Sequence, residues 1–141
     1  MTTASTIVHG SCVAVSGQGL LILGPSGSGK SSLALRLLSL GAGLVADDRT
    51  ALTVEGGSLV ARSPDPIAGL IEARGLGILR APPVGSAELA LIADLGQTET
   101  ERLPPLRHIT ILGCKISLVL QVQNDHFPDA LMLNLRYGRQ A

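Results

Sequence analysis

Aromatic and charged residues are scarce in this chain of 141 residues, which has no Trp, one Tyr, one Phe and only 16% charged residues. An ordinary globular chain carries about 25% charged residues. The lack of aromatic rings excludes a platform on which unpaired bases could stack. Eleven basic residues balance eleven acidic ones, so no basic surface is available for non-specific nucleic-acid binding. We therefore expect no nucleic-acid partner.

Cysteines and long apolar runs are also few. Cys12 and Cys114 lie far apart and do not have the spacing of a zinc site or a disulfide framework. Both lie in apolar runs, which predicts buried thiols. The apolar runs are strand-sized, far below the roughly 20 residues of a membrane span, and residues 1–6 show no signal peptide. We expect a cytoplasmic protein that has no membrane partner and forms a single domain over residues 1–141.

Apolar periodicity and turn signals predict many strands and two helices. The strands are expected over 7–15, 20–23, 44–46, both sides of 55–57, 88–95 and 109–122, and the helices over 30–40 and 128–136. The short turn at 16–19 favours an antiparallel hairpin. Segment 67–71 is expected to be a short helix or a turn, and 98–105 a surface loop. This order has more strands than a regular alternation of strand and helix.

Residues 24–31 carry the most specific motif, G-x-x-x-x-G-K-[ST], in which every fixed position is matched. This composition would give about 0.004 accidental matches to that pattern. A plain Gly/Ser turn would have to explain why one of only two lysines falls here. Glycines let backbone N–H groups face an anion, the lysine reaches the terminal phosphates, and the serine suits Mg²⁺. The expected phosphate-binding residues are Gly24, Pro25, Ser26, Gly27, Ser28, Gly29, Lys30 and Ser31.

Four acidic residues are candidates to complete a nucleotide site. Asp47 and Asp48 end the strand that follows the predicted 30–40 helix, so at least one should lie beside the phosphates if that strand neighbours the strand at 20–23. Asp94 ends another apolar strand and could equally be a strand-end cap. Glu72 precedes Arg74 and two glycines, where a surface ion pair with Arg74 is the simpler alternative.

The ordered combination resembles the catalytic domain of HPr kinase/phosphorylase. It consists of His9-Gly10, the 24–31 motif, Asp47-Asp48 and the segment 72–77, Glu-Ala-Arg-Gly-Leu-Gly. The resemblance covers residues 9–102 and implies a P-loop kinase of the α/β class with a mixed, phosphoenolpyruvate-carboxykinase-like sheet. It further implies phosphorylation of a serine on an HPr-like phosphocarrier of the phosphotransferase system, with ATP and Mg²⁺. Reversal by phosphorolysis is also implied.

Residue roles follow from this resemblance. Asp47 would be the base that accepts the seryl proton, and Asp48 would support it or the metal. Lys30 would hold the β- and γ-phosphates, and Ser31, Glu72 and Asp48 would ligate Mg²⁺. The resemblance also places His9 near the active site, Arg102 on the transferred phosphate, and Arg74, Gly75 and Gly77 in the signature loop.

Departures from the family pattern keep other functions open. The chain starts almost at the catalytic core, so it resembles short forms that have no N-terminal regulatory domain. The stretch 113–117 lacks the Arg-Asn pair that the family ties to phosphorolysis, and Ser32 stands where an acid is usual. Two alternatives therefore remain, a small-metabolite P-loop kinase and a nucleotide-sensing module without transfer chemistry. A homo-oligomer is left open.

Overall fold

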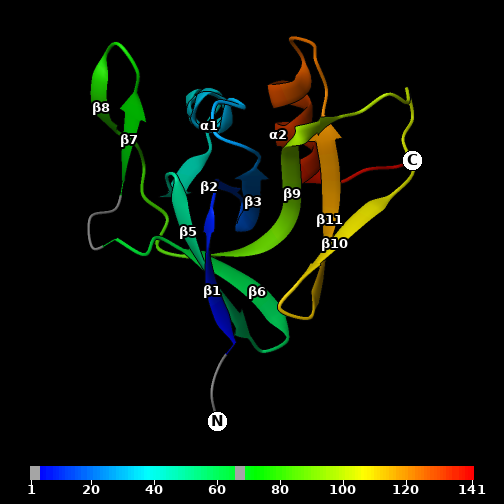
Figure 1. The fold of residues 1–141 in the computed structure, drawn as a ribbon, viewed down its shortest axis with the longest axis horizontal. Helices are drawn as coiled ribbons and strands as arrows, with labels where there is room; N and C mark the ends of the chain where they lie inside the picture. Colours follow the sequence, from blue (N-terminus) through cyan, green and yellow to red (C-terminus); the bar gives the residue numbers. More distant parts are fainter. Residues whose placement is uncertain (1–3, 66–68) are drawn as a thin grey trace.

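A computed structural model describes residues 4–65 and 69–141. Its main sheet is mixed and strongly curled, with two helices on one face (Figure 1). The strands of this sheet are β1 Ser5–His9, β2 Ser11–Val15, β3 Gln18–Leu23, β4 Gly43–Ala46, β5 Arg49–Glu55, β6 Ser58–Arg62, β9 Ala87–Thr98, β10 Arg107–Ile111 and β11 Cys114–Gln121. The helices are α1 Lys30–Ser39 and α2 Phe127–Tyr137. The α/β class with a mixed sheet is confirmed.

Strand β9 organises the sheet. It pairs in parallel with β3 on one side. On the other side its first residues pair with β6, antiparallel, and residues from Leu91 onward pair with β11, in parallel. The sheet therefore divides at this edge into a β6–β5–β1 branch and a β11–β10 branch. In Figure 1, β9 bends sharply where it passes from one partner to the other.

The central strands of the sheet are buried on both faces. All five residues of β2 are buried, and side chains of alternating residues enter two separate cores. Val13 and Val15 pack with α1 and α2, whereas Cys12 and Ala14 pack with residues of the β5–β6 branch. A strand covered on both sides must be apolar throughout, and this explains the continuously apolar runs in the sequence.

The order of β3, β2 and β4 positions the site at the edge of the sheet where β3 and β4 end. β2 forms the predicted antiparallel hairpin with β3 and also pairs antiparallel with β4. β2 therefore lies between β3 and β4. The condition stated in the sequence analysis, that the strand before Asp47 neighbours the strand at 20–23, is not met. Since β2 runs opposite to both, its first residue meets the ends of β3 and β4 at one edge.

A second, two-stranded sheet was not predicted. It is the hairpin of β7 Leu70–Ala73 and β8 Gly77–Arg80, at the upper left of Figure 1. The expected short helix or turn over 67–71 is wrong for Leu70 and Ile71, which begin β7, and the rest of that segment lies largely outside the described residues. Exposure alternates along β7, with Ile71 and Ala73 buried, but four residues were too short to reveal this period in the sequence.

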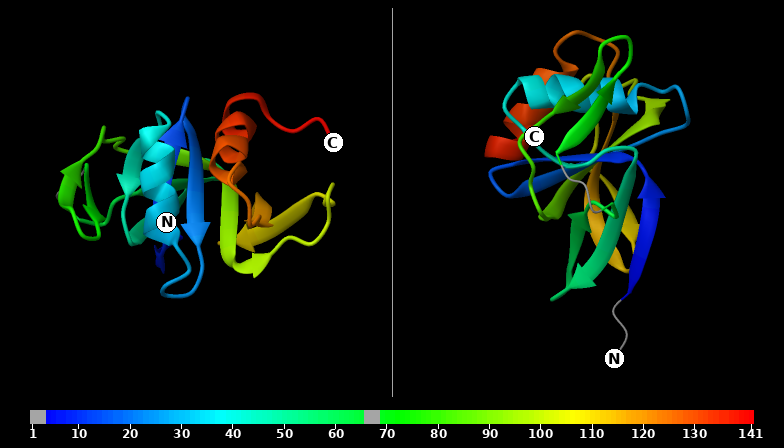
Figure 2. Two further views of the ribbon diagram at one scale, coloured as in Figure 1. Left: turned by 90° about the horizontal axis from the view of Figure 1, so that it is seen from above. Right: turned by 90° about the vertical axis from the view of Figure 1, so that its left-hand side faces the viewer.

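The helices lie side by side, with α1 between the β7–β8 hairpin and α2 (Figure 2). Within the described residues, neither is long and apolar enough to cross a membrane. The predicted hairpin at 55–57, the loop at 98–105 and both helices agree with the structure to within one or two residues at most boundaries. Cys12 is fully buried as predicted, but Cys114 is only half-buried, because it starts β11 at the outer hairpin with β10.

Candidate active site

The loop at residues 24–31 joins the end of β3 to the start of α1 and requires its glycines. Gly24, Gly27 and Gly29 have φ values of 151°, 80° and 98°, in a region that residues with a Cβ atom rarely adopt. A Cβ at Gly24 would lie 2.6 Å from Ser28 Oγ. The motif glycines are therefore demanded by the backbone path of this loop.

Lys30 and the beginning of α1 give the loop its positive character. Lys30 Nζ donates hydrogen bonds to the carbonyl oxygens of Gly24, at 2.8 Å, and Pro25, at 3.2 Å. The N-cap Gly29 supplies no side-chain cap, and no acidic residue lies in the first turn of α1. The positive end of the helix dipole is therefore left for an anion.

Asp47 connects three parts of the site. Its Oδ1 accepts hydrogen bonds from Ser11 Oγ at 3.1 Å and Ser31 Oγ at 3.4 Å. Its Oδ2 accepts one from the backbone N–H of Glu72 at 3.4 Å. The half-buried Asp47 carboxylate thus joins the start of β2, the first turn of α1 and the β7–β8 hairpin.

Asp48 occupies a strained position directly after Asp47. Its φ is 66°, in the left-handed region that few non-glycine residues adopt. Its N–H donates to Ser11 Oγ at 3.1 Å, and the N–H of Arg49 donates to the carbonyl of Asp47 at 2.7 Å. Such backbone strain is concentrated at functional sites. The turn places the two carboxylates of the pair in the same pocket.

That pocket has a volume of about 450 Å³ and collects residues from three predicted motifs. It is lined by Ser26, Gly27, Gly29, Lys30, Ser31, Ser32, Leu35, Asp47, Asp48, Glu72, Ala73 and Arg74. The 24–31 loop, the Asp47-Asp48 pair and the start of the 72–77 segment therefore meet, although they are separated along the chain. Gly24, Pro25 and Ser28 belong to the same loop but do not line the pocket.

Other predicted site residues lie outside this pocket. Gly75 and Gly77 are exposed at the turn of the β7–β8 hairpin, beyond Arg74. His9 is exposed at the end of β1, where it pairs with Arg49. Arg102 is exposed in the loop between β9 and β10. The roles expected for these residues stay predictions.

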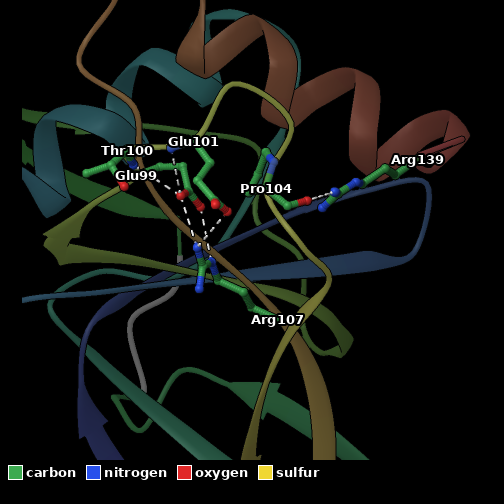
Figure 3. Close-up of polar contacts among 6 residues, drawn as sticks. All are labelled: Glu99, Thr100, Glu101, Pro104, Arg107 and Arg139. Atoms are coloured by element: carbon green, nitrogen blue, oxygen red, sulfur yellow. Dashed lines mark hydrogen bonds and ion pairs between the residues drawn. The ribbon is translucent and has the colours of Figure 1, made fainter.

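The loop that carries Arg102 is tied down at both ends (Figure 3). Arg107 forms two hydrogen bonds to the Glu99 carboxylate, at 3.1 and 3.0 Å, and its guanidinium lies 4.0 Å from Glu101. Arg139, after α2, donates to the carbonyl of Pro104. These contacts hold the loop against β10, β11 and the end of α2.

Asp94 lies within β9, which continues to Thr98, so it is not the strand-end cap that the simpler alternative predicted. Its Oδ1 accepts from the N–H of Gly96 at 2.8 Å, and its Oδ2 accepts from Gln97 Nε2 at 3.0 Å. Both carboxylate oxygens are thus satisfied within the same strand. Asp94 does not line the pocket.

The oxygen donors of the pocket are of the type that Mg²⁺ prefers. In the described part of the chain, no three His, Cys, Asp or Glu side chains are placed to hold a metal by themselves. Mg²⁺ usually binds one or two carboxylates together with substrate phosphates and waters. Asp48 and Glu72, together with the Ser31 hydroxyl in the same pocket, fit that requirement.

Sequence reasoning did not single out Ser11, which is fully buried and contacts both Asp47 and the backbone of Asp48. The only signal was a polar residue that interrupts the apolar run at 7–15. Serine is common in strands and loops alike, so this signal alone could not have identified it.

Comparison with known proteins supports this set of motifs. The family described as "HPr Serine kinase C-terminal domain" matches residues 1–85. The HPr kinase/phosphorylase of Bordetella pertussis is 41% identical over 130 residues, which cover 82% of this chain and 42% of that protein. The HPr kinase/phosphorylase of Bacillus cytotoxicus is 51% identical over 76 residues, covering 53% of this chain and 25% of that one. The chain thus spans less than half the length of these relatives.

A solved structure shares the fold. The structure titled "Structure of the Hpr(Ser) kinase/phosphatase from Coxiella burnetii" aligns with a TM-score of 0.76 and 26% identity. The alignment covers 93% of this chain and 94% of that one, so it includes the C-terminal part beyond residue 85. The family match covers more than half of the chain and includes the 24–31 loop, Asp47-Asp48 and residues 72–77. The chain therefore belongs to the family of HPr serine kinase C-terminal domains.

Proposed function

We propose that this domain is an ATP- and Mg²⁺-dependent protein-serine kinase that phosphorylates an HPr-like phosphocarrier. The observation that carries the proposal is the convergence on Asp47: its carboxylate contacts Ser31 of the phosphate loop and the backbone of Glu72 in one pocket. Phosphoryl transfer depends mainly on positioning and on stabilisation of charge, and this pocket combines cationic, hydroxyl and carboxylate groups.

Each residue of the pocket has a separate task in this proposal. Lys30 and the N-terminal turn of α1 bind the β- and γ-phosphates. Bound Mg²⁺ would neutralise charge on the phosphate oxygens, with Ser31, Asp48 and Glu72 as the residues that hold it. Asp47 accepts the proton of the attacking seryl hydroxyl as the new P–O bond to the γ-phosphorus forms and the bond from that phosphorus to ADP breaks. Arg74 lines the pocket and is exposed, and it would cover developing negative charge there.

The finer features of the resemblance extend this proposal. The curled mixed sheet with its phosphate loop after β3 supports a phosphoenolpyruvate-carboxykinase-like fold. In phosphorolysis, inorganic phosphate would attack the phosphorus of the phosphoserine to form pyrophosphate. The bond between this phosphorus and the serine oxygen would break, and the protonated Asp47 carboxyl would give its proton to the serine oxygen. A contribution of Arg102 would require the 99–106 loop to leave the contacts that Glu99, Arg107 and Arg139 make.

A transfer assay with a mutated base tests the proposal. The protein is incubated with ATP, Mg²⁺ and purified HPr, and phosphoserine is located by mass spectrometry. Asp47→Asn should abolish transfer, since an uncharged amide cannot accept the seryl proton. Its nucleotide affinity should stay within about 3-fold of the wild-type value. Asp94→Asn is the matched control, because Asp94 bonds only within its own strand, and it should keep its activity.

Other outcomes assign other functions. ATP turnover with small alcohols but not with HPr would identify a metabolite kinase. Nucleotide binding without any transfer, together with a partner-dependent function that survives Asp47→Asn, would identify a sensing module. Either result would contradict the proposed protein kinase.

A further inference from the structure

Ser11 occupies the gap between the two strands that carry the site. β3 leads into the phosphate loop and β4 leads into Asp47, but β2 separates them. Ser11 is the first residue of β2 and pairs with Ile22, one residue before the end of β3, while Cys12 pairs with Ala46 at the end of β4. The Ser11 hydroxyl is therefore the side-chain group of β2 that lies at the edge where β3 leads into the phosphate loop and β4 leads into Asp47.

The hydrogen bonds of the Ser11 hydroxyl have a fixed direction. The N–H of Asp48 can only donate, so the Ser11 oxygen accepts that bond at 3.1 Å. The ionised Asp47 carboxylate can only accept, so the Ser11 proton points to Asp47 Oδ1, also at 3.1 Å. One buried hydroxyl thus orients the Asp47 carboxylate and closes the left-handed turn at Asp48.

The other two contacts of Asp47 are longer and more exposed. Ser31 Oγ and the N–H of Glu72 each lie 3.4 Å from a carboxylate oxygen, near the limit of a hydrogen bond. In the proposed function Ser31 turns toward Mg²⁺, so its contact with Asp47 does not persist. Ser11 is 0% exposed and has no such second task, which leaves it as the contact that keeps Asp47 in place during the reaction.

We propose that Ser11 is a positioning residue, which holds Asp47 in line with the attacking serine and fixes the Asp47-Asp48 turn. This rests on the proposed kinase function, in which Asp47 is the base. A reacting group displaced by about 1 Å can lose roughly 100-fold in rate. Ser11→Ala should therefore lower kcat by about 10- to 100-fold. Nucleotide affinity should stay within about 3-fold of the wild-type value, because the phosphate loop itself keeps its contacts.

Thr50 offers a matched control. Among the described residues, Ser11 and Thr50 are the two buried polar ones, both 0% exposed. Thr50 Oγ1 donates to the carbonyl of Gly10 at 2.9 Å, so it supports the same strand boundary without touching Asp47. Thr50→Val, which removes a buried hydroxyl of the same kind, should leave kcat within about 3-fold even if it lowers the melting temperature. Ser11→Thr keeps the hydroxyl and should recover most of the activity that Ser11→Ala loses.

Two readouts separate this inference from the proposed function. Amide hydrogen exchange needs no substrate: exchange at Asp48 should accelerate in Ser11→Ala and stay unchanged in Thr50→Val. Kinetics with ATP, Mg²⁺ and HPr then measure kcat against nucleotide affinity. If Ser11→Ala keeps wild-type exchange at Asp48, or if Thr50→Val loses as much kcat as Ser11→Ala, the positioning role is wrong. A wild-type protein that transfers no phosphate contradicts the proposed function, and exchange at Asp48 still decides whether Ser11 holds the turn.

Discussion

Asp47 Oδ1 lies 3.4 Å from the hydroxyl of Ser31, and this contact joins the end of β4 to the first turn of α1. The two residues are 16 positions apart. Strand β2 separates β3, which leads into the phosphate loop, from β4, which leads into Asp47. The helix between them brings the chain back over the sheet, so a carboxylate and a phosphate-loop serine meet at one edge. A phosphate loop binds nucleotides in many proteins; in the proposed function, the carboxylate beside it accepts the proton of a seryl hydroxyl.

The two lysines of the chain allow a controlled test of the phosphate loop. Lys30→Met removes the ammonium that lies across the loop, and nucleotide affinity should fall by about 10- to 100-fold, the usual effect of losing a charge-assisted hydrogen bond. Lys115→Met, on the exposed face of β11, should change it by less than about 2-fold. Isothermal titration with Mg-ATP measures both. Equal affinity in wild type and Lys30→Met would contradict nucleotide binding at this loop.

Gly24 tests whether the loop's backbone path is required. Gly24→Ala places a methyl group 2.6 Å from Ser28 Oγ at a φ of 151°. Strain of this kind costs about 1–3 kcal/mol, and a loop that relaxes it should also bind nucleotide less tightly. Urea unfolding and nucleotide titration measure the two effects. Gly85→Ala is the control, because a Cβ there meets no atom within 4 Å, and it should change stability by less than about 0.5 kcal/mol.

The sequence predicted those parts of the site that depend on local spacing. The 24–31 loop and the Asp47-Asp48 pair could be found because their residues are adjacent and their chemistry is specific to phosphate and metal. Their convergence with Glu72 rested on the family resemblance, and the structure brings all three into one pocket.

Features that depend on distant pairing could not be predicted. The importance of Ser11 follows from the position of β2 between β3 and β4, and no local pattern reports strand order. The β7–β8 hairpin consists of two four-residue strands joined through glycine, too short to show a period. The resemblance alone placed His9 near the active site and Arg102 on the transferred phosphate, and in the structure both are exposed and do not line the pocket.

The two cysteines should differ sharply in reactivity. Burial raises the pKa of the Cys12 thiol to about 12, so almost no reactive thiolate exists at neutral pH. Cys114 is half-buried, and its Sγ lies 3.7 Å from the carbonyl of Gly57 at the surface. A thiol reagent should modify one cysteine in the native protein and two after unfolding. Cys114→Ser should leave no thiol that reacts in the folded state; rapid labelling of that variant would show that Cys12 is accessible.

The ion pair between Glu99 and Arg107 should hold the loop that carries Arg102. The Arg107 hydrogen bonds keep the pKa of Glu99 below the usual range of a glutamate. Because this pKa is lower in the folded than in the unfolded state, the contribution to stability is present at neutral pH and is lost as the pH falls through the folded-state value. Arg107→Gln should therefore lower the melting temperature at pH 7, and the difference from wild type should shrink as the pH falls below the usual pKa range of a glutamate.

Arg62→Gln is the matched control for this pair. Arg62 also forms an ion pair, with Glu55. The side chains of Arg62 and Glu55 are 43% and 42% exposed, whereas the Glu99 side chain is 6% exposed. An exposed pair contributes little, so Arg62→Gln should have the smaller effect. Limited trypsin digestion adds a local readout: cleavage after Arg102 should accelerate in Arg107→Gln, because its loop has lost an anchor, and stay at the wild-type rate in Arg62→Gln. Equal rates in all three proteins would mean that Arg107 does not restrain this loop.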